Sequence, residues 1–127
     1  MQTLTVEQYQ REQRRRMSEA LFQGHVIREA LDSGWPYQFI FHDRDSRGNR
    51  RGLPDLIMIN GTRLLFAELK KVGGSATPEQ RAWLDALANV ETVESYLWRP
   101  TDWDQVVEVL GNGHGAGSTP VSVKRSG

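Results

Sequence analysis

Apolar residues recur at helical spacing early in the chain. One face of a helix is predicted by five of them, spaced mostly by three or four: Leu21, Phe22, Val26, Ala30 and Leu31. The pattern predicts a helix from Ser18 to Ser33, which Gly34 ends. Helical character can also begin earlier, near Val6, with Thr5 as its cap. The run from Tyr37 to His42 is typical of a strand.

The segment LPDLIMINGTRLLFAELKK contains two apolar runs separated by Asn60-Gly61, which predicts a β-hairpin because these residues tolerate positive φ. With both as central turn residues, Ile59 faces Thr62 and Asp55 faces Phe66. Side chains alternate along a strand, so one face carries Asp55, Ile57, Ile59, Leu64, Phe66, Glu68 and Lys70. The other carries Leu56, Met58, Leu65, Ala67 and Leu69. Both faces are apolar, and helices on both sides of the sheet are therefore expected, in an α/β fold.

Helix and strand signals continue through the second half. Thr77 is a predicted N-cap with Pro78 at the first helical position, and the segment from Glu94 to Arg99 predicts a strand. A last helix is predicted from a Thr101 cap to Gly111. We expect one folded domain over residues 18–111, a basic segment with helical potential over 1–17, and a disordered Gly- and Ser-rich tail over 112–127.

Composition narrows the chemistry of any site. The chain of 127 residues has no cysteine, which excludes disulfides and thiolate zinc sites and leaves oxygen or histidine ligands for a metal. No apolar run approaches the roughly 20 residues that cross a bilayer, so we expect no membrane partner. The first residues lack the apolar stretch of a secretory signal, and we therefore expect a cytoplasmic protein.

Basic residues are clustered although the formal net charge is zero. One cluster precedes the helix at Ser18 and includes Arg14, Arg15 and Arg16. The other lies just before Pro54-Asp55 and consists of Arg44, Arg47, Arg50 and Arg51. Both are candidate contacts for a nucleic-acid backbone, and the alternative is a solvated arginine-rich surface.

Asp55, Glu68 and Lys70 share one face of the predicted hairpin. In the expected register Glu68 lies diagonally across from Asp55, at about 7–8 Å between Cα atoms. Mg²⁺ prefers oxygen ligands and is often held by one or two carboxylates, so this pair is a candidate Mg²⁺ site, with Lys70 placed to orient water or meet a phosphate. The structural alternative is that Asp55 opens a strand and Glu68 with Lys70 forms an exposed ion pair.

The runs GLPDLIMI, FAELKK and TPEQRAWLDAL closely resemble the virus-type replication-repair nuclease (VRR-NUC) domain of the PD-(D/E)XK superfamily, from about Ser18 to about Pro100. The resemblance implies a restriction-endonuclease-like core, with a mixed sheet flanked by helices in the order α-β-β-β-α-β-α. It implies Asp55, Glu68 and the Leu69 carbonyl as metal ligands and Lys70 as the catalytic lysine. It also implies Glu19 as a further acidic ligand and Gln80 as a residue that orients the lysine or water.

Two of these residues have simpler explanations. Glu19 follows a potential Ser18 cap, where a carboxylate interacts favourably with the helix dipole. Gln80 stands three residues after Thr77, where a capping box accounts for it without catalysis.

The expected function is therefore a Mg²⁺-dependent DNA endonuclease in which Mn²⁺ can substitute. The resemblance implies junction or flap processing, including Holliday junctions, in a phage or bacterial setting, and pairing into homodimers. Two rivals stay open: a non-cleaving DNA-binding module of the same fold, and an RNA-directed nuclease with the same site.

Overall fold

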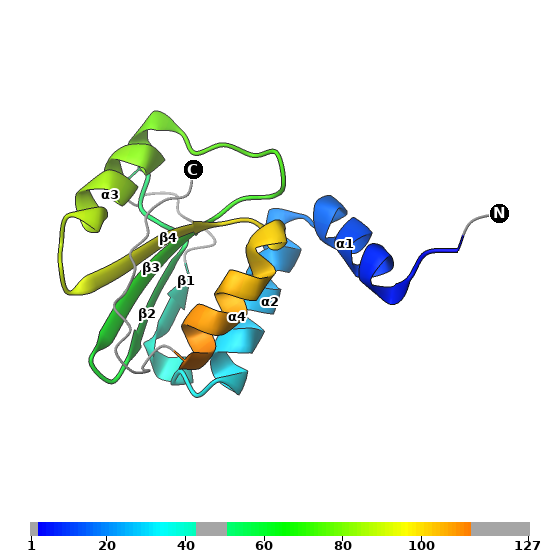
Figure 1. Ribbon diagram of the computed structural model, residues 1–127. Helices are drawn as coiled ribbons and strands as arrows, with labels where there is room; N and C mark the ends of the chain where they lie inside the picture. The colour runs from blue at the N-terminus through cyan, green and yellow to red at the C-terminus, as the bar shows by residue number, and fades with distance from the viewer. Residues whose placement is uncertain (1–2, 43–50, 113–127) are drawn as a thin grey trace.

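A mixed β-sheet forms the centre of the molecule (Figure 1). The computed structural model describes residues 3–42 and 51–112, and within them the sheet has four strands in the order β1-β2-β3-β4. The strands are β1 Ile40–His42, β2 Leu56–Asn60, β3 Arg63–Leu69 and β4 Val93–Trp98. The helices are α1 Val6–Arg16, α2 Glu19–Asp32, α3 Pro78–Ala88 and α4 Trp103–Asn112, with 3₁₀ turns η1 Tyr37–Phe39 and η2 Pro100–Asp102.

The element order from α2 to α4 is α-β-β-β-α-β-α, which confirms the predicted α/β class. Strands β1, β2 and β3 pair antiparallel, whereas β4 runs parallel to β3. The parallel pair needs a crossover connection, and α3 supplies it. The helix predicted from Ser18 is α2, whose first turn is capped by the Ser18 side chain. The earlier helical segment is α1, with Thr5 and Gln8 forming a capping box.

The hairpin is present, but its predicted register is wrong by two residues. Asn60 pairs with Arg63, so Gly61 and Thr62 form the turn, and Gly61 has a φ of 64°. The glycine takes the left-handed conformation without the steric cost that a side chain adds. A shift of two residues keeps every side chain on its face, so the predicted assignment of faces holds.

One face of the sheet is buried along β2, β3 and β4 under α2 and α4, which lie together on the same side of it (Figure 1). Each strand residue predicted for this face is at most 1% exposed: Leu56, Met58, Leu65, Ala67 and Leu69. They meet Phe22 and Val26 from α2 and Val106 and Leu110 from α4. Burying each large apolar side chain contributes about 1.5–3 kcal/mol, so this layer is the main source of stability.

The other face is covered less completely than predicted. Helix α3 packs against β4, and Leu84 is its buried contact. Phe41 and Ile59, on the β1 and β2 side, remain 50% and 41% exposed. The reason is that the single crossover helix covers only part of this face.

Several local predictions were wrong. Only Ile40–His42 of the predicted strand from Tyr37 is extended, because Tyr37–Phe39 forms a 3₁₀ turn. The last helix is not capped by Thr101; instead Asp102 accepts the Arg99 backbone N–H at 2.8 Å, and the helix continues through Gly111. On the predicted apolar face of the helix from Ser18, Leu21 and Leu31 are 54% and 37% exposed.

The tail over 113–127 lies outside the described residues. Within the described part of the chain, no helix has the length and apolar character needed to cross a membrane.

A charged network is buried near the hairpin turn. Arg63 donates from Nε and Nη2 to the two carboxylate oxygens of Glu94, each at 2.6 Å, and Tyr96 donates its hydroxyl to Glu94 at 2.9 Å. The Arg63 guanidinium also lies 4.9 Å from the ring centre of Trp35. Burial, with the adjacent Glu94 charge, raises the pKa of Tyr96 well above its ordinary value, so the phenol stays a hydrogen-bond donor. Every member of the network thus has a partner for its charge or its proton.

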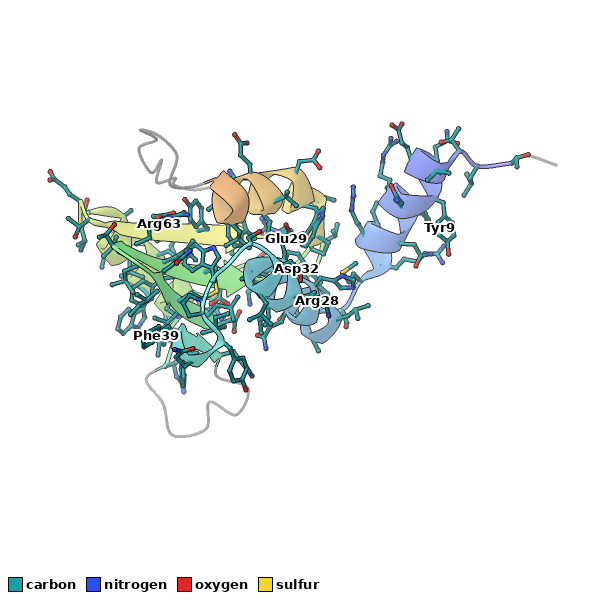
Figure 2. The ribbon with its side chains drawn as sticks, turned by 90° about the horizontal axis from the view of Figure 1, so that it is seen from below. Tyr9, Arg28, Glu29, Asp32, Phe39 and Arg63 are labelled. Carbon is teal, nitrogen blue, oxygen red and sulfur yellow. The ribbon has the colours of Figure 1, made fainter. Side chains whose placement is uncertain are left out.

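Replacing Arg63 with methionine will leave the Glu94 carboxylate buried without its cation. We expect the free energy of unfolding to fall by about 3–5 kcal/mol, measured by urea denaturation. The matched control is Arg28→Met, because Arg28 makes an exposed ion pair with Asp32 on α2 (Figure 2). This replacement should lower the free energy of unfolding by less than about 1 kcal/mol. Equal losses in the two variants would contradict a stabilising role for the buried pair.

Candidate active site

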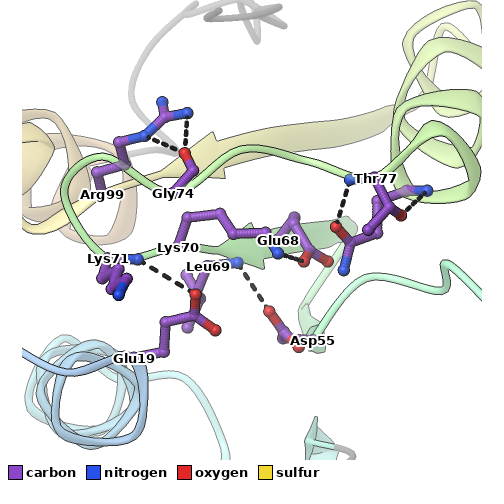
Figure 3. Close-up of polar contacts among 10 residues, drawn as sticks. Glu19, Asp55, Glu68, Leu69, Lys70, Lys71, Gly74, Thr77 and Arg99 are labelled. Atoms are coloured by element: carbon purple, nitrogen blue, oxygen red, sulfur yellow. Dashed lines mark hydrogen bonds and ion pairs between the residues drawn. The ribbon is translucent and has the colours of Figure 1, made fainter.

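Asp55 and Glu68 stand opposite each other where β2 begins and β3 ends. Leu56 pairs with Ala67, so one further step of the register places Asp55 against Glu68 rather than diagonal to it. The Leu69 backbone N–H donates to Asp55 Oδ2 at 2.8 Å (Figure 3). The aspartate side chain thereby takes the place of a backbone acceptor beyond the end of β2, and this bond fixes the direction of its carboxylate.

The loop before Asp55 is held in place by Gly52. This residue has a φ of 91°, and a Cβ on it would lie 2.6 Å from backbone atoms of Glu79, in the first turn of α3. Only glycine allows both the backbone conformation and the close approach. The loop that carries Asp55 is therefore docked on the start of α3.

Glu68 is buried at 1% exposure, which is unusual for a carboxylate. Its Oε2 lies 3.8 Å from Lys70 Nζ, and its Oε1 has no hydrogen-bond partner within the described part of the chain. The pKa of Glu68 is raised from its ordinary 4.5 to about 8, chiefly by burial and then by the charge of Asp55, while Lys70 acts in the opposite direction. Burial likewise raises the pKa of Asp55, although the Leu69 N–H opposes this.

Lys70 continues the strand direction beyond Glu68. Its backbone N–H donates to the Trp98 carbonyl at 3.0 Å, which ties the start of the β3–α3 loop to the end of β4. In a strand, the N–H and the C=O of one residue point to the same side. The Leu69 N–H faces Asp55, so the Leu69 carbonyl also points to the side of β3 on which Asp55 lies.

Glu19 reaches this end of the sheet from the first turn of α2. Its Oε2 accepts the backbone N–H of Lys71 at 3.4 Å (Figure 3), and its charge raises the pKa of both Asp55 and Glu68. In residues 3–42 and 51–112, however, no three acidic or histidine side chains are grouped as ligands of one metal ion. Direct ligation by Glu19 stays a prediction.

The donor set suits a hard cation. Glu68 presents a buried oxygen with no partner in residues 3–42 and 51–112, and Asp55 and the Leu69 carbonyl are oxygen donors at the same strand end. Mg²⁺ needs only one or two protein carboxylates because it retains waters and binds substrate phosphate. A cation would also offset the cost of an ionised Glu68 in this buried position.

Gln80 serves the start of α3 in this structure. Its Oε1 accepts the Thr77 N–H at 2.8 Å, and its own N–H donates to Thr77 Oγ1 at 3.1 Å. This confirms the predicted capping box. The catalytic role that the resemblance implies for Gln80 stays a prediction.

The arginines of the N-terminal cluster lie on a helix of their own. Arg14, Arg15 and Arg16 occupy the last turn of α1, which projects from the body of the molecule (Figure 2, where Tyr9 marks this helix). The side chains of Arg15 and Arg16 are 57% and 73% exposed and both approach Glu12. Arg51 is exposed in the loop before Asp55, while Arg44, Arg47 and Arg50 lie outside the described residues.

Two positioning residues escaped the sequence analysis. Arg99 donates from Nε and Nη2 to the Gly74 carbonyl at 3.2 and 2.8 Å, which anchors the loop after Lys70. Gly52 docks the opposite loop, as described above. No local pattern points to either contact, since both join segments far apart in the sequence.

Comparisons with known proteins agree on one family. The family model described as "VRR-NUC domain" matches residues 3–97, most of the chain. A solved structure described as "VRR_NUC domain protein" shares the fold with a TM-score of 0.54 and 24% sequence identity, over 74% of this chain and 85% of that one. A search of curated proteins finds no match.

The raised pKa of Glu68 predicts how stability depends on pH in the absence of metal. The folded state holds the Glu68 proton up to about pH 8, whereas the unfolded chain releases it near 4.5. The free energy of unfolding should therefore fall as pH rises through this window, because the folded state binds more protons there. In EDTA, the melting temperature should drop by several degrees between about pH 5 and about pH 8.

Glu68→Gln keeps the shape of the side chain without its charge. We expect most of the pH-dependent drop to disappear, so that the variant melts above the wild type at about pH 8. A wild-type melting temperature that stays level across the window would contradict the raised pKa.

Proposed function

Because this chain belongs to the VRR-NUC domain family, a family of nucleases, we propose that it is a divalent-metal-dependent endonuclease that hydrolyses DNA phosphodiester bonds. The observation that supports the proposal most is the buried Glu68 carboxylate, with an unpartnered oxygen, opposite Asp55 and 3.8 Å from Lys70. A structural ion pair would not require a second carboxylate that raises the pKa of the first.

Each residue of the site has a role in the proposed reaction. Asp55, Glu68 and the Leu69 carbonyl would hold Mg²⁺ or Mn²⁺, with the Leu69 N–H orienting Asp55. The bound cation supplies Lewis-acid chemistry, which polarises phosphate oxygens and lowers the pKa of water. Lys70 places an ammonium where it can orient the attacking water or offset the charge that develops on phosphate. Glu19 adds negative charge that strengthens the attraction for a cation.

The rival binding module is disfavoured by the energetics of Glu68. A protein that only held DNA would gain stability and lose repulsion toward phosphate by replacing this buried acid. An RNA-directed nuclease would use the same groups, and only a substrate comparison separates the two. Branched DNA, a homodimeric assembly and a phage or bacterial role remain part of the proposal.

Cleavage of supercoiled plasmid and of a labelled four-way junction should require Mg²⁺ or Mn²⁺ and stop in EDTA. Glu68→Gln and Lys70→Ala should each reduce the rate by about 10²-fold or more, because each removes a charge that acts on the transition state. The matched control is Glu108→Gln, an exposed glutamate of α4. Junction-shaped RNA provides the substrate comparison. Wild-type protein that binds DNA but never cuts it, or variants that cut at the wild-type rate, would contradict the proposed nuclease.

The exposed arginines of α1 should contribute binding without sequence preference. Each phosphate contact adds about 0.9 to the slope of log affinity against log salt concentration. We expect Arg15→Ala with Arg16→Ala to reduce this slope by about 2 for any DNA sequence, measured by fluorescence anisotropy. The control is Arg28→Ala on α2, which should leave the slope unchanged. An unchanged slope in the double variant would show that α1 does not contact the backbone.

A further inference from the structure

A cavity of about 220 Å³ lies where α1 meets α2 and the start of α4. An apolar cavity of about 150 Å³ is large enough to hold benzene, so this space accommodates a somewhat larger planar ring. It is separate from the carboxylate cluster, and none of the residues assigned to metal binding lines it.

Apolar and aromatic groups form much of the wall. They are Met17, Phe22, Pro100 and Trp103, of which Phe22 is only 1% exposed. His25 meets the Trp103 ring edge-on, with ring centres 6.3 Å apart and an interplanar angle of 87°. Such a wall favours a flat, uncharged ring that can stack on aromatic side chains.

Polar side chains of α1 line the other side. Gln10 and Gln13 each carry an amide that can donate and accept hydrogen bonds, as the edge of a base requires. Arg14 adds a guanidinium suited to a phosphate, and Arg15 and Arg16 follow it on the same helix. The cavity therefore combines an apolar wall, amide groups and nearby cations. This combination fits a nucleotide better than a purely apolar ligand.

Two backbone connections place the cavity beside the candidate active site. Phe22 follows Glu19 by three residues on α2, a rise of about 4.5 Å along the helix axis. Pro100 is two residues after Trp98, whose carbonyl accepts the Lys70 N–H at 3.0 Å. The cavity and the carboxylate cluster are thus built on neighbouring residues of α2 and of the chain around the end of β4.

Building on the proposed function, we infer that this cavity binds one unpaired nucleobase of the DNA substrate, adjacent to the bond that is cut. A paired base must first be unpaired and unstacked before it can enter the cavity, whereas an unpaired base need not be. The cavity thus gives the enzyme a physical basis for selecting DNA with an unpaired base near the cleavage site, without reading sequence.

The test uses the full chain with Ca²⁺ and two DNA probes, a duplex with one bulged 2-aminopurine and the fully paired duplex. Wild-type protein should bind the bulged probe about tenfold more tightly, and stacking in the cavity should change the 2-aminopurine fluorescence. Gln13→Trp, which fills the cavity from an exposed helix position, should remove both effects. Tyr9→Trp, an exposed position of the same helix outside the cavity, should keep them.

Trp103→Ala should also remove the preference, with circular dichroism checking that it folds. Equal binding of the two probes by wild-type protein that still cuts DNA would overturn the cavity's role and leave the nuclease standing. Failure to bind or cut any DNA would overturn both. Retention of the preference in Gln13→Trp would also contradict the inference.

Discussion

The hydrogen bond from the Leu69 N–H to the Asp55 carboxylate is the contact on which the candidate site depends. It extends the hairpin ladder one step past the end of β2, and it uses a side chain where a backbone carbonyl would otherwise stand. Because the register then places Asp55 opposite Glu68, two acids meet at the closest spacing that a sheet provides. This position costs stability: burial raises the pKa of both carboxyl groups, and the charge of Asp55 adds to the rise for Glu68.

The rest of the fold offsets this cost. The face under α2 and α4 is apolar and nearly inaccessible to solvent, and each large side chain there contributes about 1.5–3 kcal/mol. The buried charges of Arg63 and Glu94, by contrast, neutralise each other near the hairpin turn. The two ends of the hairpin therefore differ. At the turn the buried charges are paired, whereas at Glu68 one carboxylate oxygen has no hydrogen-bond partner among the residues that the structure describes. That asymmetry supports the proposed active site at the second end.

The sequence pattern was sufficient to predict features that depend on helical spacing or on the alternation of side chains along a strand. It was insufficient for features that depend on contacts between distant segments. The assignment of side chains to the two faces of the hairpin was predictable, because a register error of two residues does not move any side chain to the other face. The register itself was not, because Asn60-Gly61 and Gly61-Thr62 both offer a glycine for the turn, and only the packed sheet selects between them. The docking of Gly52 on α3 and of Arg99 on Gly74 has no local signal at all.

The parallel pairing of β4 with β3 explains why the groups of the candidate site gather at one end of the sheet. Parallel strands end on the same edge, so the residues after Lys70 and after Trp98 leave the sheet side by side. Helix α3 and then helix α4 therefore have their first turns near this end, and α2 begins there too, with Glu19 against the Lys71 N–H. Helix N-termini carry partial positive charge and unpaired N–H groups. Under the proposed function, an acidic cluster that admits an anionic DNA backbone is less repulsive when such termini lie near it. The same topology that positions the carboxylates thus tempers their field, which an antiparallel β4 would not do.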